Sequence, residues 1–270
     1  MDKFIDTHAH YNSNKFKNRD RLLLDLRKEV EYIINLGTDV NSNLQTMKLI
    51  YKHDYLYGMV GFFPTNVYQI EKELSDEADI NLICFHQQID SQKIVGIGEI
   101  GLDYHWNCVG DLKGEKAREY QKKWFLYQLN LAKELNLPVS MHSRDAEKDT
   151  IEIFNNYESI KGVMHCFSYG LDSAKIYLEK GLYFGIGGTS TYPSNKELRE
   201  VIDFLPIDKI LLETDAPYLS PNQVRRAINT SSNIKYVIEN IAKIKGISEE
   251  DVIKETNKNA INLFKFGGNQ

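Results

Sequence analysis

The sequence predicts a single α/β domain over residues 1–270, folded as a closed (β/α)8 TIM barrel. Three observations predict this fold class. Eight short apolar segments recur along the chain, helical patterns lie between most of them, and the length of 270 residues is close to the about 250 residues that one barrel commonly has. A doubly wound open sheet usually has fewer strands at this length.

The eight apolar segments have the length and composition of buried parallel strands. They are rich in Val, Ile and aromatic residues and nearly continuous in apolar character, as expected of strands that are covered on both faces. In chain order they span residues 4–8, 32–36, 57–63, 94–100, 138–142, 162–167, 182–187 and 210–214.

Amphipathic helical patterns separate most of these strands. In the clearest, at 114–136, large apolar side chains recur every three or four residues among Lys, Glu and Gln. Those side chains are Tyr120, Trp124, Tyr127, Leu131 and Leu135. A further helix is indicated by Leu198, Val201 and Ile202, and patterns at 234–245 and 248–264 follow the last strand. No internal repeat or linker predicts a second domain.

Charge and cysteine usage limit the classes of function. The net charge of −5 provides no overall attraction for a polyanion, so a nucleic-acid substrate would need local cations. The N-terminal residues lack a signal-peptide core and no apolar run could span a bilayer. We therefore expect a cytoplasmic protein that is not bound to a membrane and has no obligate protein partner. Cys84, Cys108 and Cys166 lack C-x-x-C spacing and are interpreted as reduced thiols.

Side chains that can bind metal ions end five of the predicted strands, and in a barrel these ends converge. His8 and His10 end the first strand, where their i, i+2 spacing puts both imidazoles on one face. The fourth, fifth, sixth and eighth strands end on Glu99, His142, His165 and Asp215. Each residue alone has a structural interpretation, but six N and O donors at one rim favour a site for Zn²⁺, Mn²⁺ or Mg²⁺.

Five ordered motifs contain these six residues. They are Ile5-Asp-Thr-His-Ala-His10, Gly98-Glu-Ile-Gly-Leu-Asp-Tyr104, Met141-His-Ser-Arg-Asp-Ala146, His165-Cys-Phe-Ser168 and Leu212-Glu-Thr-Asp-Ala-Pro-Tyr218. With them the chain resembles the TatD family of metal-dependent deoxyribonucleases, among the amidohydrolase-like barrels, from residue 4 to about residue 264. The resemblance implies two divalent ions. One would be bound by His8, His10 and Asp215 and the other by His142 and His165, while Glu99 bridges both.

Two segments depart from the family pattern. Members usually carry His in a Gly-x-His-Pro segment after the third strand, whereas this chain reads Gly61-Phe-Phe-Pro64, so Phe63 replaces an imidazole near the substrate. The loop at 221–229 keeps Arg225 and Asn229 but lacks the usual small residue and closing proline. Both departures bear on substrate preference.

The resemblance implies DNA as the substrate, shortened from a single-stranded 3′ end by metal-assisted hydrolysis. Asp215 would accept the proton of the attacking water, and Glu99 would be the second catalytic residue. For phosphate contacts we expect the rim-loop residues His105, Arg144 and Arg225, although Arg144 could instead pair with Glu213.

Four neighbouring residues have alternative interpretations. Tyr104 and Trp106 could stack on an unpaired base or anchor their loop on the barrel. Asp6 could orient an imidazole or form a surface ion pair. Cys166 should face away from the metal ligands, since adjacent strand residues point to opposite sides, and is interpreted as a packing residue.

Two other functions remain open from the sequence. A hydrolase of small esters, amides or lactones would use the same metals and differ only in the rim loops, which the departures at Phe63 and 221–231 allow. A non-catalytic metal-binding adaptor is the third hypothesis, and the retention of all six donors argues against it.

Overall fold

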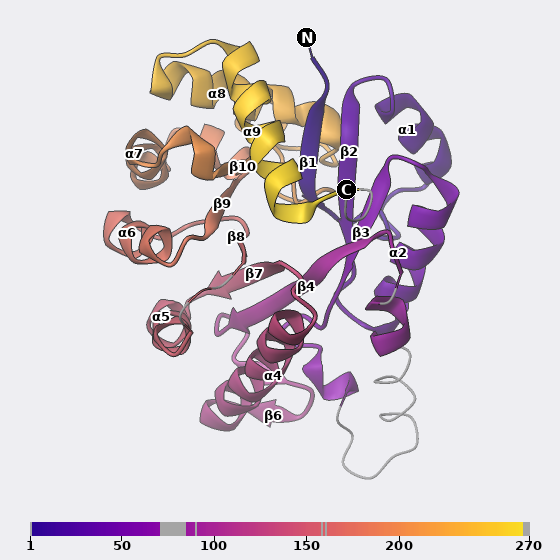
Figure 1. Cartoon of the computed structure of the whole chain (residues 1–270), viewed down its shortest axis with the longest axis vertical. Helices are drawn as coiled ribbons and strands as arrows, with labels where there is room; N and C mark the ends of the chain where they lie inside the picture. The colour runs from indigo at the N-terminus through magenta and orange to yellow at the C-terminus, as the bar shows by residue number, and fades with distance from the viewer. Residues whose placement is uncertain (1, 71–84, 90, 158, 160, 267–270) are drawn as a thin grey trace.

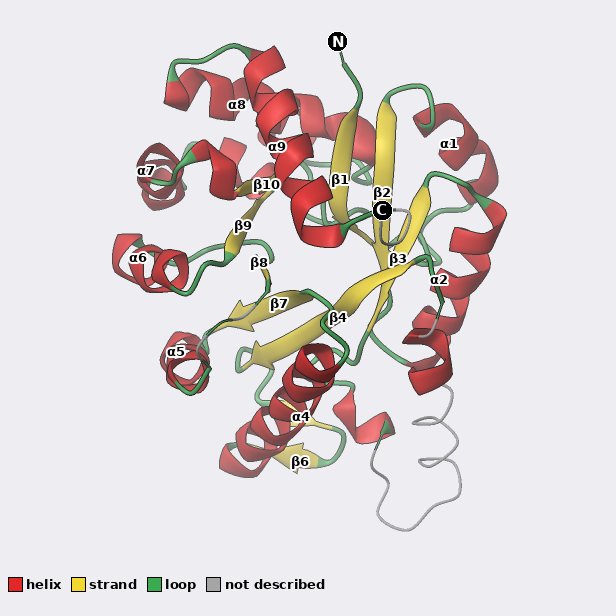
Figure 2. Ribbon diagram, in the orientation of Figure 1, coloured by secondary structure: helices red, strands yellow, loops and turns green. Residues whose placement is uncertain are grey.

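Eight parallel strands form one continuous sheet, in the order β1-β2-β3-β4-β7-β8-β9-β10. The computed structural model describes residues 2–70, 85–89, 91–157, 159 and 161–266. Figure 1 and Figure 2 show the strands as an inner ring with the helices outside it. The predicted (β/α)8 TIM barrel is therefore confirmed.

The strands match the predicted segments, with differences at their ends. They are β1 (Phe4–Ala9), β2 (Val30–Leu36), β3 (Leu56–Val60), β4 (Ile94–Asp103), β7 (Val139–Arg144), β8 (Gly162–Met164), β9 (Tyr183–Ile186) and β10 (Ile210–Leu212). The predicted third and sixth strands run too far, because residues 61–63 and 165–167 lie in loops. β4 extends past its predicted end because Ile100 to Asp103 pair with Met141 to Arg144 of β7. A small antiparallel pair, β5 (Cys108–Val109) and β6 (Leu112–Lys113), follows β4.

Helices alternate with the strands and pack on the outside of the sheet. They are α1 (Arg19–Leu26), α2 (Val40–Lys52), α4 (Glu115–Glu134), α5 (Glu147–Asn155), α6 (Leu171–Glu179), α7 (Lys196–Phe204), α8 (Ile234–Lys245) and α9 (Glu249–Phe264). Short 3₁₀ turns are η1 (Val67–Gln69), η2 (Gly188–Thr191), η3 (Ile207–Lys209), η4 (Asn222–Val224) and η5 (Ser231–Asn233). The four helices predicted from apolar periodicity are thus present as α4, α7, α8 and α9. No helix in the described part of the chain is long and apolar enough to cross a membrane.

Alternation along the strands divides the buried apolar residues into two clusters. The larger cluster lies between the strands and the helices, and the smaller one contains alternate strand residues such as Ile5, Ile34 and Leu211, as expected of a barrel interior. Phe264 of α9 belongs to the smaller cluster. Asn257 of the same helix bonds the backbone of Ile5 at the start of β1. Helix α9 therefore closes the amino-terminal end of the barrel and leaves the carboxyl ends of the strands for a site.

The barrel closes between β1 and β10 through a few bonds rather than a long ladder. An isolated parallel bridge joins Ala9 to Ala216. The His10 amide donates to the Ala216 carbonyl at 2.7 Å, and the Asp215 amide donates to the His8 carbonyl at 2.9 Å. The seam therefore joins the segment that carries two of the predicted metal ligands to the segment that carries a third.

Asp6 reinforces this seam from a fully buried position. Its carboxylate accepts hydrogen bonds from the Thr214 amide (3.1 Å), the Thr214 hydroxyl (2.7 Å), the Ser231 hydroxyl (2.6 Å) and the His8 amide (3.3 Å). Both expectations for Asp6 were therefore wrong. It contacts the backbone of His8 rather than an imidazole, and it is no surface ion-pair partner, because it holds chain segments together from the interior.

Candidate metal centre

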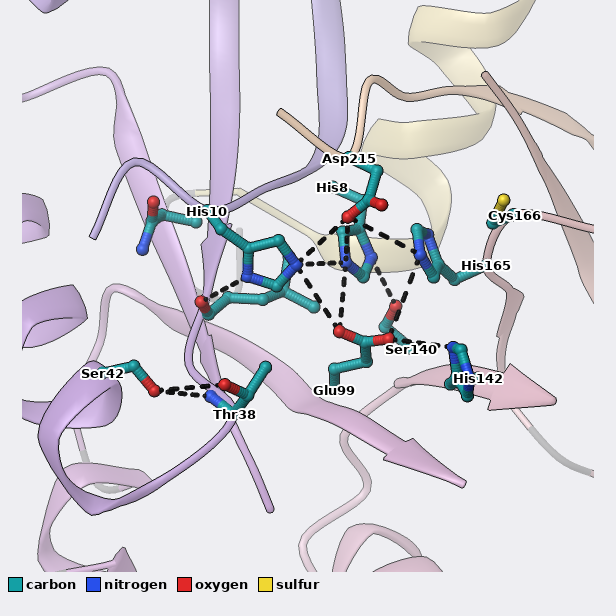
Figure 3. Close-up of polar contacts among 12 residues, drawn as sticks. His8, His10, Thr38, Ser42, Glu99, Ser140, His142, His165, Cys166 and Asp215 are labelled. Atoms are coloured by element: carbon teal, nitrogen blue, oxygen red, sulfur yellow. Dashed lines mark hydrogen bonds and ion pairs between the residues drawn. The ribbon is translucent and has the colours of Figure 1, made fainter. Parts of the chain in front are cut away.

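The six side chains predicted to bind metal lie together at the carboxyl ends of the strands, as Figure 3 shows. We call them the His–carboxylate cluster: His8, His10, Glu99, His142, His165 and Asp215. Five strands or their following loops supply them. Glu99 lies inside β4 rather than at its end, a correction that follows from the longer pairing of β4 with β7.

One part of the cluster gathers around the two histidines of β1. His8 Nε2 and His10 Nε2 are 3.1 Å apart. Asp215 Oδ1 lies 3.3 Å from His10 Nε2 and 3.9 Å from His8 Nε2, and Glu99 Oε2 lies 3.5 and 3.6 Å from the same nitrogens. Donors bound to one tetrahedral zinc ion at ordinary distances are separated by roughly 3.3 Å, so this spacing fits a shared ion.

The other part gathers around the second Glu99 oxygen. Glu99 Oε1 lies 3.2 Å from His142 Nδ1 and 4.0 Å from His165 Nε2. The two oxygens of one buried carboxylate therefore face two different pairs of imidazoles. Figure 3 shows His10 on one side of Glu99 and His142 and His165 on the other.

The donor chemistry fits divalent ions. Two facing imidazole nitrogens at 3.1 Å, as in His8 and His10, have room for one proton at most between them, whereas a cation can accept both lone pairs. Imidazole and carboxylate ligands suit Zn²⁺ and Mn²⁺. Three groups of three among the described residues have all their ligand atoms within 4.8 Å of one another: His8, His10 and Asp215; Glu99, His142 and His165; and His8, His165 and Glu213.

Burial and charge set the protonation of the metal-free cluster. Burial raises the pKa of Glu99, but hydrogen bonds from His142 and His8 outweigh it and hold that pKa well below its usual value. Burial likewise works against the charge on Asp215, whose pKa is nevertheless lowered, chiefly by His10. Burial lowers the pKa of His8 to about 4. Both carboxylates are therefore ionised at neutral pH, and His8 is neutral.

Each histidine of the cluster has a partner for the ring nitrogen that points away from the other ligands. The pairs are His8 Nδ1 with Ser140 Oγ, His10 Nδ1 with the Leu36 carbonyl, His142 Nε2 with Asp103 Oδ2 and His165 Nδ1 with Glu213 Oε1, each at 3.1 Å. Sequence reasoning missed Ser140, Asp103 and Glu213 in these roles. Asp103 and Glu213 stand inside the quoted motifs, so their place beside predicted ligands was the available signal.

Three strand ends around the cluster turn through left-handed backbone. Asp145, Cys166 and Asp215 have φ of 54°, 47° and 57° and follow β7, β8 and β10. Such a conformation costs a residue other than glycine on the order of 1 kcal/mol or more. The Cys166 amide donates to Glu213 Oε1 at 2.7 Å, which stabilises the turn after His165. Local strain is thus concentrated where strands that carry cluster residues end.

Two of the three predicted phosphate-binding residues have aromatic or acidic neighbours. His105 and Arg225 are exposed in rim loops. His105 Nδ1 lies 3.2 Å from Asp145 Oδ2, and the Arg225 guanidinium lies 4.5 Å from the centre of the Tyr192 ring. Both side chains remain on the surface that surrounds the cluster.

Arg144, at the end of β7, is also exposed. The alternative that Arg144 pairs with Glu213 is not what the structure shows, since the Glu213 carboxylate contacts His165 and Cys166 instead. Within the described residues the Arg144 guanidinium has no ion pair, which leaves its charge available at the rim.

The aromatic residues after β4 divide into an anchor and an exposed ring. Tyr104 is buried and its hydroxyl donates to Asp149 Oδ2 at 2.6 Å, so it anchors the loop and does not offer a stacking face. Trp106 is 63% exposed. The Phe63 ring lies 4.7 Å from the His142 ring, so an apolar side chain borders the cluster.

The remaining residues named from the sequence are structural or lie outside the described residues. Asn229 is buried and donates to the Thr214 and Tyr218 carbonyls, which secures the loop after β10. Cys166 belongs to none of the three candidate metal-ligand groups, and Cys84 is outside the described residues. Two hollows of about 130 and 600 Å³ open near the amino ends of β4, β7 and β8 and include no cluster residue.

A barrel with this cluster at its carboxyl rim belongs to the class of metal-dependent hydrolases. The family model described as TatD related DNase matches residues 5–265, and the chain is a member of the TatD family. It is 34% identical over 266 residues to the protein of Bacillus subtilis (strain 168) named "Uncharacterized metal-dependent hydrolase YabD", covering 97% of this chain and 99% of that one.

Solved structures agree with this placement. The crystal structure of YJJV, a TatD homolog from Escherichia coli K12, is 28% identical and superposes with a TM-score of 0.82, covering 97% of this chain and 98% of that one. A hydrolase TatD family protein from Entamoeba histolytica has a TM-score of 0.83 over the same shares of the two chains; at 24% identity it supports the fold alone.

Proposed function

We propose that this protein is a deoxyribonuclease that uses two divalent ions, Zn²⁺, Mn²⁺ or Mg²⁺, to hydrolyse phosphodiester bonds from the 3′ end of single-stranded DNA. The observation that carries the proposal is the divergence of the two Glu99 oxygens toward two pairs of imidazoles. Phosphodiester hydrolysis by two ions requires ligands that hold both at a short separation. The family model, whose description names a DNase, supports DNA as the substrate.

The imidazoles divide between the two ions by the Glu99 oxygen that each of them faces. His8, His10 and Asp215 would hold one ion, and His142 and His165 the other, while Glu99 contributes one oxygen to each. When bound, the ions would lower the pKa of a water molecule and polarise the phosphoryl oxygens.

Asp215 is the proposed proton acceptor. Its lowered pKa keeps the carboxylate ionised at neutral pH, and its exposure is greater than that of Glu99, so it can reach a water at the open side of the cluster. Glu99 is 4% exposed and ionised, and its catalytic role is to hold the two halves of the cluster at a fixed separation.

Rim residues would bind the DNA. His105, Arg144 and Arg225 supply local positive charge or hydrogen-bond donors that offset the net charge of −5. The exposed Trp106 ring offers a stacking face for an unpaired base, which favours a single strand.

The test is product analysis of 5′-end-labelled single- and double-stranded DNA with Mg²⁺, Mn²⁺ or Zn²⁺. Bis(p-nitrophenyl) phosphate and p-nitrophenyl acetate serve as small phosphodiester and carboxyl-ester substrates, and Glu99→Gln as the inactive control. We expect a ladder of labelled products that shortens stepwise on the single strand. Early release of a labelled mononucleotide would show the opposite polarity. Turnover of the carboxyl ester alone would indicate a small-ester hydrolase, and no turnover at all would support the adaptor hypothesis.

A further inference from the structure

The two pairs of imidazoles differ in what supports them from outside. The outward nitrogens of His8 and His10 contact neutral acceptors, a hydroxyl and a carbonyl. The outward nitrogens of His142 and His165 contact carboxylates, those of Asp103 and Glu213, which we call the outer carboxylates. Among the described residues, the imidazoles of one pair therefore contact carboxylates with their outward nitrogens, and the imidazoles of the other pair do not.

Glu213 is built into the fold for this contact. It is 1% exposed and lies over bare backbone of β9, since a Cβ added at Gly185 would fall 2.0 Å from Glu213 Oε2. Its Oε1 accepts the Cys166 amide and lies 3.1 Å from His165 Nδ1, an ion-pair contact that is not aligned as a hydrogen bond. Its Oε2 has no hydrogen-bond partner among the described residues. Burying an unpaired carboxylate costs free energy. The contacts of Oε1 are therefore the ones that stabilise Glu213 in this position.

Asp103 reaches the same half of the cluster from another strand. It ends β4, is 1% exposed, and its Oδ2 lies 3.1 Å from His142 Nε2. Its Oδ1 accepts the His105 amide at 3.0 Å. The Gln121 amide group bonds both the backbone N–H and the carbonyl of Asp103, at 2.8 and 2.9 Å. One hydrogen bond to the carboxylate and two to the backbone of Asp103 therefore fix the position of this side chain.

We propose that Asp103 and Glu213 are positioning residues for one metal position only, that of His142 and His165. Each carboxylate keeps the outward ring nitrogen protonated, which leaves His142 Nδ1 and His165 Nε2 free to bind an ion beside Glu99 Oε1. Carboxylate partners make imidazoles stronger ligands, and their loss typically costs about 10- to 100-fold in metal affinity. Metal binding at the other position, that of His8, His10 and Asp215, does not depend on the outer carboxylates. The inference builds on the two-ion site of the proposed function.

The test is a Zn²⁺ titration of metal-free protein in competition with a chromophoric chelator, which measures metal binding without activity. With affinities corrected for the protons that the ion displaces, Glu213→Gln and Asp103→Asn should each weaken the same one of two binding events about 10- to 100-fold and leave the other unchanged. Ser140→Ala, which removes the partner of His8, should affect only the other event. Asp145→Asn removes an exposed carboxylate that contacts His105, outside the cluster, and should change neither.

A second readout separates positioning from a general structural role. In Zn²⁺-loaded protein, imidazole ¹⁵N shifts should report a protonated Nδ1 for His165, and Glu213→Gln should move the His165 signals without moving those of His10. Glu213→Asp, which keeps the charge but shortens the side chain, should restore part of the affinity.

Several outcomes would overturn the inference. Wild-type affinities in both Glu213→Gln and Asp103→Asn would do so, and so would equal weakening of both events. If circular dichroism shows that Glu213→Gln does not fold, the metal affinities of Asp103→Asn alone test the inference. A single binding event in the wild type would contradict the two-ion proposal. The positioning role would then stand only if both variants weaken that one event.

Discussion

At the residue scale, Asp215 has two proposed roles, that of a metal ligand and that of a proton acceptor. Its Oδ1 is 3.3 Å from His10 Nε2 and 4.0 Å from His165 Nε2, and its left-handed backbone directs the carboxylate from the end of β10 into the cluster. Ligation needs an oxygen donor, whereas proton transfer needs a basic group. Substitutions can therefore separate the two roles.

Asp215→Asn should keep most of the bound metal, since the amide oxygen can still coordinate, but lose the proton acceptor. General-base contributions are about 10²- to 10⁴-fold, so kcat should fall by that factor with little change in KM. The measurement is kcat at saturating Mn²⁺, with metal content checked by elemental analysis. Asp215→Ala should lose metal as well. Near-normal kcat in a fully loaded Asn variant would leave Asp215 as a ligand only.

His165 makes metal binding depend on pH. Burial works against its charge, but Glu213, Glu99 and Asp215 outweigh burial and raise the pKa of His165 to about 10 in the metal-free protein. Ligation requires the neutral ring nitrogen, so at pH 7 an incoming ion displaces a proton. Metal affinity is therefore low below this pKa and should rise with pH, about tenfold per pH unit for each proton displaced.

Calorimetric titration with Zn²⁺ in two buffers of different ionisation enthalpy counts the displaced protons. We expect at least one proton released per chain at pH 7, and fewer in His165→Ala. Release of no proton, with an affinity that stays constant from pH 6 to 8, would show that His165 is already neutral in the metal-free protein.

At the scale of elements, the seam between β1 and β10 depends on side chains more than on strand pairing. Both strands carry cluster residues at or just beyond their ends, and Asp6 joins them through Thr214 and Ser231. Apolar periodicity predicts strands but carries no information on how the first and last strands meet. Asp6 could therefore be placed on β1 from the sequence, but its role could not be predicted.

Asp6→Ala should destabilise the metal-free protein by about 2–4 kcal/mol, because the buried Thr214 and Ser231 donors lose their acceptor. The shift of the urea unfolding midpoint measures the effect. Asp2→Ala, at an exposed residue near the same strand, is the matched control and should leave the midpoint unchanged. Equal midpoints for the two variants would show that the seam does not need Asp6.

At the scale of the whole molecule, the cluster contains candidate ligands from five of the eight strands or the loops that follow them. Bound ions would therefore link segments across the ring, including the two sides of its seam. Because an ion binds the folded cluster and not the dispersed ligands of the unfolded chain, binding stabilises the fold.

Removal of metal with a chelator should lower the thermal midpoint. At a free metal concentration of 100 times Kd, each site contributes about 2.7 kcal/mol, which corresponds to roughly 5–10 °C for a chain of this size. Differential scanning fluorimetry before and after chelation, and after restoring Zn²⁺ or Mn²⁺, measures the change. Glu99→Gln should show a smaller shift. An unchanged midpoint on chelation in the wild type would argue against binding at a cluster that links the strands.

The sequence alone determined the barrel and the six candidate ligands, because both follow from local patterns: apolar runs of strand length, and polar donors at or near strand ends. Three features could be read only from the folded chain: β4 runs on to Asp103, Asp6 closes the seam, and Tyr104 is a buried anchor. The tertiary structure also decided that Asp103 and Glu213 contact His142 and His165. These contacts join residues far apart in the chain, so their distances exist only once the strands are placed around the ring.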